Sequence, residues 1–253
     1  MIMLYFSGTG NSKYIAELFS QTMGAACYSI EENRDFTHLI AEEGTIAFCY
    51  PVYCSRVPRI MSEFTAKYQK PLENKKVIIL CTQMMFSGDG ARAFTDSFPR
   101  GFLNVIFAEH ITMPNNICNI AVLPLAKENK ARECVLRARQ KVQDICDEIK
   151  AGKIRKRGFN PGSRALGLIQ GVFYPPFKRT SLGRIWIDGD CDLCLLCVSA
   201  CPMANFQLEN GELSTKGNCM ACCRCINLCP KKAIAVYLRT KVKKQYRGVD
   251  VIL

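Results

Sequence analysis

Eight of the sixteen cysteines in the chain fall into two copies of one spacing. Each copy reads C-x2-C-x2-C-x3-C-P, so three cysteines stand three positions apart and the fourth is followed by proline. The copies consist of Cys191, Cys194, Cys197 and Cys201, and of Cys219, Cys222, Cys225 and Cys229. Thiolates are soft ligands that suit zinc and iron–sulfur clusters. The spacing therefore indicates metal ligation by cysteine.

Two 4Fe-4S clusters explain this pattern better than disulfides or zinc. In the bacterial ferredoxin run, three closely spaced thiolates hold one cube and the fourth cysteine reaches the other cube. A disulfide framework needs an oxidising compartment, and no secretory signal is recognisable. A zinc site closes with four ligands and gives no reason for a third cysteine two residues on, repeated twice. We assign one cluster to Cys191, Cys194, Cys197 and Cys229, and the second to Cys219, Cys222, Cys225 and Cys201.

A phosphate-binding turn is expected near the start of the chain. The apolar run 2–6 breaks into Ser7, Gly8, Thr9, Gly10, Asn11 and Ser12, and apolar residues then recur at helical spacing until Gly24. Glycines let the backbone approach a ligand, and the N–H groups at a helix start attract phosphate. A dinucleotide-binding fingerprint needs a third glycine at the position where Lys13 stands. A Walker A loop needs a Gly-Lys-Ser/Thr step, which is absent. The three hydroxyls suit a terminal phosphate monoester such as that of FMN, although a ligand-free turn remains the alternative.

Strands and helices alternate through the first 150 residues. Residues 45–50, 76–82 and 104–108 are expected to form strands, with a weaker one at 27–30. A helix is expected from Pro58 and a long amphipathic one before Gly152. This alternation predicts an α/β fold with a doubly wound parallel sheet, in which ligands bind at the carboxyl ends of the strands.

Two loops at those carboxyl ends carry apolar or aromatic side chains suited to flank a flat ring. Taken singly, these residues are better explained as ordinary loop and core positions. Together with the phosphate turn on the same sheet edge, they indicate a ring-binding site. The expected contacts are Pro51, Val52 and Tyr53 in the first loop, and Thr82, Gln83, Met84, Met85, Phe86, Ser87 and Gly88 in the second.

The chain resembles the EFR-type family of flavodoxin–ferredoxin fusions. The resemblance rests on both cysteine motifs, the Ser7 to Ser12 loop, Pro51-Val52-Tyr53, Ser87-Gly88, Met113-Pro114-Asn115-Asn116 and Ile149-Lys150-Ala151-Gly152-Lys153. It implies a flavodoxin-like domain with strand order 2-1-3-4-5 that binds FMN, followed by a smaller α+β two-cluster ferredoxin domain. The expected boundaries are 1–152 for the first domain, 153–184 for a basic linker, 185–238 for the ferredoxin domain and 239–253 for a basic tail.

Positive charge is concentrated in the C-terminal part of the chain. The formal net charge is +12, and residues 1–152 carry 17 Lys and Arg against 16 Asp and Glu, whereas residues 153–253 carry 17 against 6. We expect an acidic redox partner, such as a ferredoxin, a flavodoxin or an oxidoreductase, to dock near the linker arginines or near Lys241, Lys243, Lys244 and Arg247. A nucleic-acid partner is not expected, because the basic runs lack interleaved aromatic residues.

The linker contains an apolar stretch, 166–177, among basic residues. It is too short to span a membrane, so packing between the domains or contact with a membrane surface is expected. Without a transmembrane segment, the protein is expected to be cytoplasmic, where clusters are assembled.

The remaining cysteines are expected to be small core residues, namely Cys27, Cys49, Cys81, Cys118, Cys134 and Cys146. Cys54 is a candidate redox thiol, since Arg56 nearby would favour its thiolate. The chain has two histidines and no paired acid and base, so no catalytic residue is assigned.

The leading functional hypothesis is electron transfer, in which FMN and the two clusters exchange single electrons. The alternative is a flavin-dependent reductase of a small molecule, with the ferredoxin domain as its electron inlet. A third interpretation is a basic nucleic-acid or membrane module in which clusters serve as structure or sensor.

Overall fold

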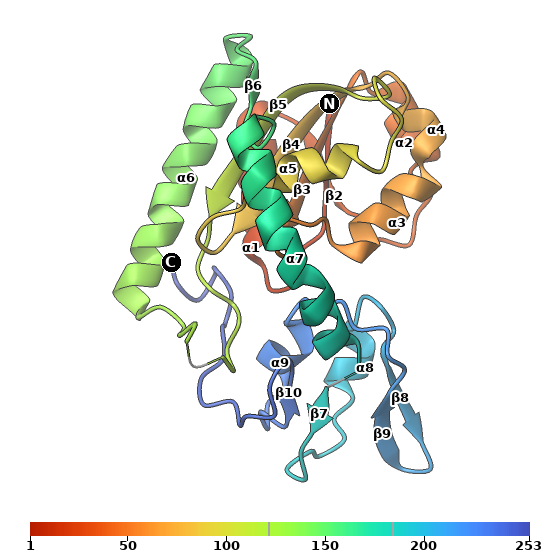
Figure 1. Ribbon diagram of the computed structural model, residues 1–253, viewed down its shortest axis with the longest axis vertical. Helices are drawn as coiled ribbons and strands as arrows, with labels where there is room; N and C mark the ends of the chain where they lie inside the picture. Colours follow the sequence, from red (N-terminus) through yellow and green to blue (C-terminus); the bar gives the residue numbers. More distant parts are fainter. Residues whose placement is uncertain (121, 184) are drawn as a thin grey trace.

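A six-stranded parallel sheet forms the centre of the N-terminal part in the computed structural model (Figure 1). The structure describes residues 1–120, 122–183 and 185–253, and the side chains of 173–183 are not described. The sheet order is β2-β1-β3-β4-β5-β6. The strands are β1 (Ile2–Tyr5), β2 (Ala26–Ser29), β3 (Thr45–Pro51), β4 (Lys76–Gln83), β5 (Asn104–Thr112) and β6 (Arg155–Lys156).

Helices cover both faces of this sheet, because alternate residues of each strand point to opposite sides. One face packs against α1 (Asn11–Met23) and α6 (Glu128–Lys150) in a cluster that includes Met3, Ile78 and Val142. The other face packs against α2 (Thr37–Glu42), α3 (Arg59–Lys67), α4 (Gln69–Leu72) and α5 (Gly90–Thr95). The doubly wound α/β fold is therefore confirmed, with the flavodoxin-like order 2-1-3-4-5 extended by β6.

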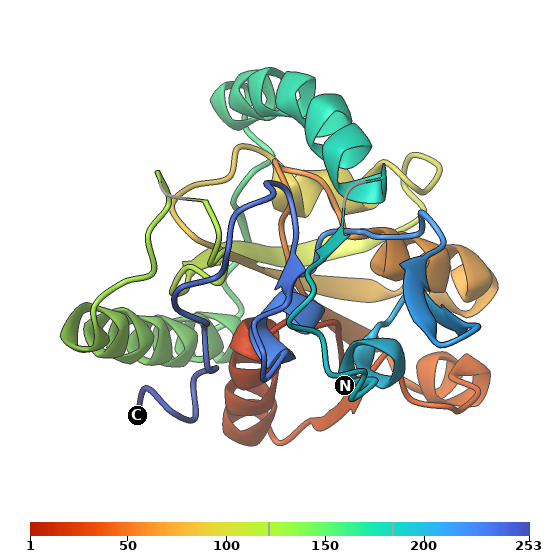
Figure 2. The same cartoon turned by 90° about the horizontal axis from the view of Figure 1, so that it is seen from below.

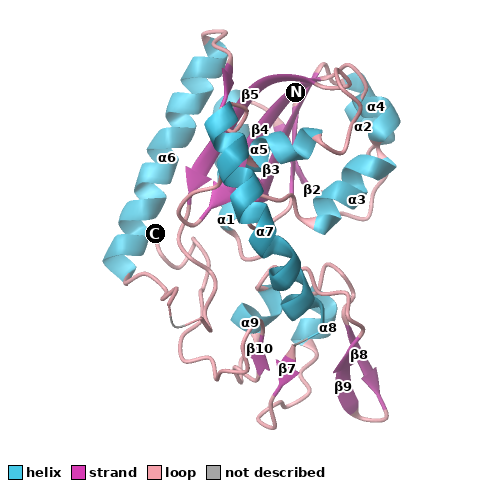
Figure 3. Ribbon diagram, viewed as in Figure 1, coloured by secondary structure: helices cyan, strands magenta, loops and turns pink. Residues whose placement is uncertain are grey.

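The register brings the carboxyl ends of four strands to one edge of the sheet. Tyr5 lies opposite Cys49, Pro51 opposite Thr82, and Thr82 opposite Ile111. The loops that follow β1, β3, β4 and β5 therefore start side by side. Figure 3 shows the long loop after β5 running down from this edge.

Strand β5 is longer than the sequence predicted, because it continues through Glu109 and His110. The Glu109 carboxylate is buried and forms ion pairs with Arg155 and Arg157 at 3.1 Å and with Lys141 at 3.3 Å. Arg155 belongs to β6, which pairs with β5 and was not predicted. These cations from a distant part of the chain allow a carboxylate to occupy the buried end of the strand.

The segment expected to be a linker contains a long helix, α7 (Pro161–Gly183), as well as β6. The helix lies across the face that carries α5 in Figure 1, and it makes contact through its glycines. A Cβ on Gly167 would come within 1.7 Å of the Asp89 Oδ1, and one on Gly88 within 2.3 Å of the Gly167 nitrogen. The larger apolar side chains point outward, since Leu168, Ile169 and Val172 are 68%, 60% and 70% exposed. The rest of the apolar stretch lies outside the described side chains.

The cysteine-rich region, residues 185–238, lies below the carboxyl edge of the sheet in Figure 1. Its antiparallel pair β7 (Trp186–Ile187) and β10 (Ile234–Ala235) joins the two ends of the region. Between them stand α8 (Leu196–Ala200), the hairpin of β8 (Phe206–Glu209) and β9 (Glu212–Thr215), and α9 (Arg224–Leu228). Figure 2 shows this region between α1 and α7.

The C-terminal residues 239–253 pack on the rest of the protein and do not extend as a free tail. Val242 is buried with the cysteine-rich region, whereas Val249 is buried in the cluster that contains α1 and α6. The Tyr246 hydroxyl donates a hydrogen bond to the Asn11 Oδ1. The segment therefore links the cysteine-rich region to the start of α1. Among the described residues, no helix has the length and apolar character needed to cross a membrane.

Candidate functional site

A cavity of about 390 Å³ opens where the loops after β1, β3, β4 and β5 meet. All the residues expected to bind FMN line it except Gly10, Ser87 and Gly88. Within the described part of the chain, no charged side chain lines this cavity. The loops found from the sequence thus come together in a largely uncharged pocket, at the sheet edge where α/β proteins bind ligands.

The phosphate turn ends in a helix start that faces this cavity. Gly10 has φ 99°, a left-handed conformation that favours glycine, and α1 begins at Asn11. The first N–H groups of a helix have no partners within the helix. The side chains of the turn are fixed by protein contacts: Ser7 Oγ accepts from the Gly10 N–H at 3.1 Å, and Ser12 Oγ lies 2.7 Å from Thr82 Oγ1. The turn is therefore preformed: the Gly10 N–H is used within it, and the first N–H groups of α1 are the ones without a partner inside the helix.

The loop after β4 supplies a buried polar group to the same cavity. Gln83 is buried, and its Nε2 donates to the Met85 carbonyl oxygen at 3.2 Å. Among the described residues, its Oε1 has no hydrogen-bond partner. A buried acceptor without a partner costs free energy, so the cavity is suited to a ligand that carries a donor at this position.

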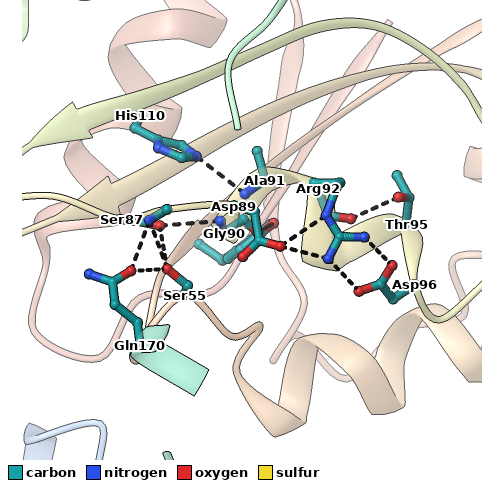
Figure 4. Close-up of polar contacts among 12 residues, drawn as sticks. Ser55, Ser87, Asp89, Gly90, Ala91, Arg92, Thr95, Asp96, His110 and Gln170 are labelled. Atoms are coloured by element: carbon teal, nitrogen blue, oxygen red, sulfur yellow. Dashed lines mark hydrogen bonds and ion pairs between the residues drawn. The ribbon is translucent and has the colours of Figure 1, made fainter. Parts of the chain in front are cut away.

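Ser87 and Gly88 do not line the cavity but belong to a polar network with α7, in which Figure 4 shows Ser87 beside Ser55 and Gln170. The Gly88 N–H donates to Ser55 Oγ at 2.8 Å and to the Gln170 Oε1 at 2.9 Å. Ser55 also donates to Gln170, which itself lines the cavity. These residues therefore hold the loops after β3 and β4 against α7. Ser87 and Gly88 therefore position the loops around the cavity and do not line it themselves.

Several cavity residues escaped the sequence analysis. The segment Met113 to Ile117 follows β5, whose predicted end at 108 was too early to point to it. Gln170 comes from the segment taken for a linker. Ala221, Cys223 and Tyr237 come from the cysteine-rich region. Among these, only Met113 to Asn116 carried a signal, as part of the family resemblance.

The second cysteine motif packs directly on the phosphate turn. Arg224 donates hydrogen bonds to the carbonyl oxygens of Ser7 at 2.7 Å and Gly8 at 3.1 Å, and it pairs with Glu31 at 2.6 Å. A Cβ on Gly8 would lie 2.4 Å from the Cys222 carbonyl oxygen. The absence of a side chain at Gly8 is thus required by a contact within the protein.

The two cysteine motifs share one backbone conformation. Positive φ angles occur at the same three positions of each motif. These residues are Leu193, Leu195 and Ala204 in the first motif, and Ala221, Cys223 and Lys232 in the second. A short helix follows in each case, α8 or α9, and ends just before the fourth cysteine. The repeat seen in the sequence is therefore also a repeat in structure.

The four thiols of the second proposed set lie near one another, and in the first set Cys191 and Cys194 lie near Cys197. Burial raises the pKa of Cys225 well above its usual value, and the neighbouring thiols Cys222, Cys219 and Cys201 act in the same direction. Burial likewise raises the pKa of Cys197 to about 11, with Cys191 and Cys194 contributing. Cys201, the fourth cysteine of the first motif, thus lies with the first three cysteines of the second.

Backbone amides point at several of these sulfurs. The N–H groups of Ala221, Asn205 and Ala233 donate to the Sγ atoms of their own motif's cysteines at 3.2, 3.4 and 3.3 Å. Such hydrogen bonds are a known device for tuning iron–sulfur clusters. All sixteen cysteines, each within the described residues, are unpaired thiols, so no disulfide framework exists. Across the described chain, no three His, Cys, Asp or Glu side chains converge on a single metal ion.

The remaining cysteine expectations are confirmed in part. Cys49, Cys81 and Cys146 are buried, whereas Cys27, Cys118 and Cys134 are half-buried. The proposal that Arg56 favours the Cys54 thiolate is wrong, because burial raises the pKa of Cys54. The Arg56 guanidinium lies instead against Gly171 of α7.

Comparison with known proteins agrees with this fold. The family model for the flavodoxin domain matches residues 2–113. No curated protein matches the chain.

Three similar solved structures represent different proteins. Two-electron reduced Megasphaera elsdenii flavodoxin is 21% identical, covering 44% of this chain and 85% of its own, with a TM-score of 0.36. Trp repressor binding protein from Bacillus subtilis is 11% identical, covering 55% and 96%, with a TM-score of 0.40. General stress protein 14 from Treponema denticola, in complex with FMN, is 13% identical, covering 58% and 96%, with a TM-score of 0.41.

Proposed function

We propose that this protein is an electron-transfer iron–sulfur flavoprotein, in which FMN and two 4Fe-4S clusters exchange single electrons with a partner redox protein. One observation carries the proposal. The cavity at the carboxyl edge of the flavodoxin-like sheet is lined both by the three predicted ligand loops and by Ala221 and Cys223 of the second cysteine motif. A flavin in this cavity would lie beside the cluster-binding loop.

The residues around the cavity fit FMN. The N–H groups at the start of α1 would hold the phosphate, since the helix dipole and free amides both favour an anion. The loops with Tyr53 and Met84 would flank the ring, and Gln83 Oε1 would accept a hydrogen bond from its polar edge. When bound, the flavin supplies a centre that handles one or two electrons.

Several features of the cysteine-rich region support two cubes. In a 4Fe-4S cluster each thiolate binds a different iron, so four sulfurs need to surround a cube rather than converge on one ion. In the bacterial ferredoxin run, the fourth cysteine of one motif binds the cluster held by the other motif. The position of Cys201, the fourth cysteine of the first motif, agrees with this, because it lies near Cys219, Cys222 and Cys225 of the second. The amide donors to Cys201, Cys219 and Cys229 add the hydrogen bonds that such sulfurs accept.

An electron carrier is favoured over a reductase with its own substrate. In the described lining of the cavity, no Asp, Glu, His, Lys or Arg stands ready to move a proton to a substrate. The partner we propose is an acidic redox protein of the cytoplasm. The exposed Lys243, Lys244 and Arg247 would speed its association, whereas Lys241 is already paired with Asp190 at 2.6 Å.

Anaerobic reconstitution tests the cofactor content. We expect about eight irons, about eight labile sulfides and one FMN per chain. Thr9→Glu or Ser12→Glu should abolish FMN binding by charge repulsion while iron content is kept. Gln21→Glu is the matched control, because it adds the same charge at an exposed position near the far end of α1. Fewer than about four irons, zinc in their place, or no FMN binding at micromolar concentration would contradict the proposal.

A further inference from the structure

The two cysteine motifs have the same backbone but opposite environments. Ala221 and Cys223 of the second motif are 2% and 4% exposed, whereas Leu193 and Leu195 at the equivalent positions of the first are 41% and 36% exposed. Cys194 of the first motif is itself exposed. One motif therefore faces the interior and the other faces solvent.

The buried motif is the one that meets the ligand cavity. Cys223 lines the cavity, and its Sγ lies 3.5 Å from the Tyr237 hydroxyl, which donates to the Ala221 carbonyl oxygen at 2.9 Å. The Asn227 Nδ2, in the helix that follows, donates to the Asn116 carbonyl oxygen at 2.9 Å. These contacts fix the second motif against the cavity wall, whereas Leu193 and Leu195 lie outside it.

We infer that the two clusters are not equivalent, an inference that rests on the proposed function. The inner cluster, held by Cys219, Cys222, Cys225 and Cys201, exchanges electrons with the flavin. The outer cluster, held by Cys191, Cys194, Cys197 and Cys229, exchanges them with the partner protein, whose docking surface includes the exposed Leu193 and Leu195.

Each transfer along this route moves one electron. Bound clusters would supply centres that each take up and release one electron: Cys191, Cys194, Cys197 and Cys229 would hold the one that accepts it from a reduced iron–sulfur protein, and Cys219, Cys222, Cys225 and Cys201 the one next to the flavin. No bond in the protein forms or breaks. A second electron follows the same route, and water supplies the protons that flavin reduction takes up.

The first test exchanges the residues at one equivalent position. Cys223 has φ 61° and ψ 12°, and Leu195 has φ 59° and ψ 10°, so the backbone conformation that accepts leucine in one motif is present in the other. Cys223→Leu should weaken FMN binding by about tenfold or more through overpacking of the cavity, with iron content unchanged. Leu195→Cys, the matched control, should leave both FMN affinity and iron content unchanged. Wild-type FMN affinity in Cys223→Leu would overturn the inference.

The second test removes one cluster at a time and follows the other by electron paramagnetic resonance and absorbance after mixing with a reduced ferredoxin. In Cys219→Ser, the remaining outer cluster should be reduced at the wild-type rate while the flavin stays oxidised. In Cys194→Ser, reduction of both the inner cluster and the flavin should slow by about tenfold or more. The opposite pattern would overturn the order of the clusters. A wild type that binds no iron or no FMN would instead refute the proposed function itself.

Discussion

Arg224 is the side chain that most directly joins the cysteine-rich region to the flavodoxin-like part, and its removal has a calculable cost. It donates to the carbonyl oxygens of Ser7, Gly8 and Ala200 and pairs with both Glu31 carboxylate oxygens at 2.6 and 2.7 Å. The side chains of Arg224 and Glu31 are 19% and 24% exposed. Most of this network is therefore shielded from water.

Replacing Arg224 by methionine keeps much of the apolar stem but removes every donor. A surface ion pair contributes roughly 0 to 1 kcal/mol, whereas breaking a buried one costs roughly 3 to 5 kcal/mol. Since this pair is partly exposed and three carbonyl oxygens also lose a partner, we expect unfolding to become easier by about 3 kcal/mol. FMN affinity should fall as well, because Ser7 and Gly8 belong to the phosphate turn.

A double-mutant cycle with Glu31→Gln separates the ion pair from the carbonyl contacts. Chemical unfolding of the reconstituted protein, the two single variants and the double variant should show a coupling of about 1 to 2 kcal/mol between Arg224 and Glu31. Arg224→Lys should recover only part of the loss, because an ammonium cannot bind several acceptors in a fixed fork. A loss below about 1 kcal/mol in Arg224→Met would refute a structural role for this network.

Three further expectations follow from other buried groups and from the surface charge. Burial, aided by Arg157, lowers the pKa of His110 from 6.5 to about 4. Folding thus favours the neutral imidazole, so the free energy of unfolding should fall by about 3 kcal/mol as the pH is lowered from 6.5 toward 4. Chemical unfolding at several pH values would measure this loss, and His110→Gln should reduce it. Gly167→Ala should lower the melting temperature, because its Cβ would lie 1.7 Å from the Asp89 Oδ1. Gly162→Ala on the same helix should not, because its Cβ would lie 3.4 Å from the Asn160 Oδ1; equal melting temperatures would contradict the contact between α7 and Asp89. The rate of electron exchange with an acidic ferredoxin should fall as ionic strength rises from about 0.1 to about 1 M, and it should fall less in a Lys243→Gln, Lys244→Gln double variant. A rate that does not depend on ionic strength would show that these lysines have no role in docking.

The strands of the sheet were predictable where their residues are continuously apolar. The expected strands 45–50 and 76–82 match β3 and β4 to within one residue at the carboxyl end. Both strands are covered on both faces, so a continuous apolar run marks each of them. β5 could not be delimited in this way. Its buried Glu109 is stabilised by Arg155 and Arg157, more than forty residues away, and no local pattern shows that pairing.

The helix α7 illustrates a different limit of sequence reasoning. Leu168, Ile169 and Val172 on this helix are exposed, whereas Gly167 is buried. Close approach of the helix to Gly88 and Asp89 requires small residues, so the glycines mark the contact. The sequence analysis expected the stretch 166–177 to pack between the domains or to contact a membrane surface, and it did not identify the glycines as the contact.

The candidate site was found in the sequence where it depends on local turns, and missed where it depends on distant contacts. The phosphate turn and the loops with Tyr53 and Gln83 follow strand ends, which the periodicity located. Cys223 and Gln170 reach the same cavity from segments more than eighty residues away. Gly8 was interpreted as room for a ligand, whereas it makes room for the Cys222 carbonyl oxygen.

The second cysteine motif does carry a local signal of its position, in the residues between its cysteines. Its left-handed positions hold Ala221 and Cys223, where the first motif holds Leu193 and Leu195. The φ angles at these four positions lie between 55° and 61°, so the difference in side-chain size reflects what lies outside each loop. Small residues are needed where the loop meets the phosphate turn and the cavity, and leucine is tolerated where it meets solvent. In a repeated cysteine motif of this kind, the size of the residues between the cysteines therefore indicates which copy packs against the rest of the protein.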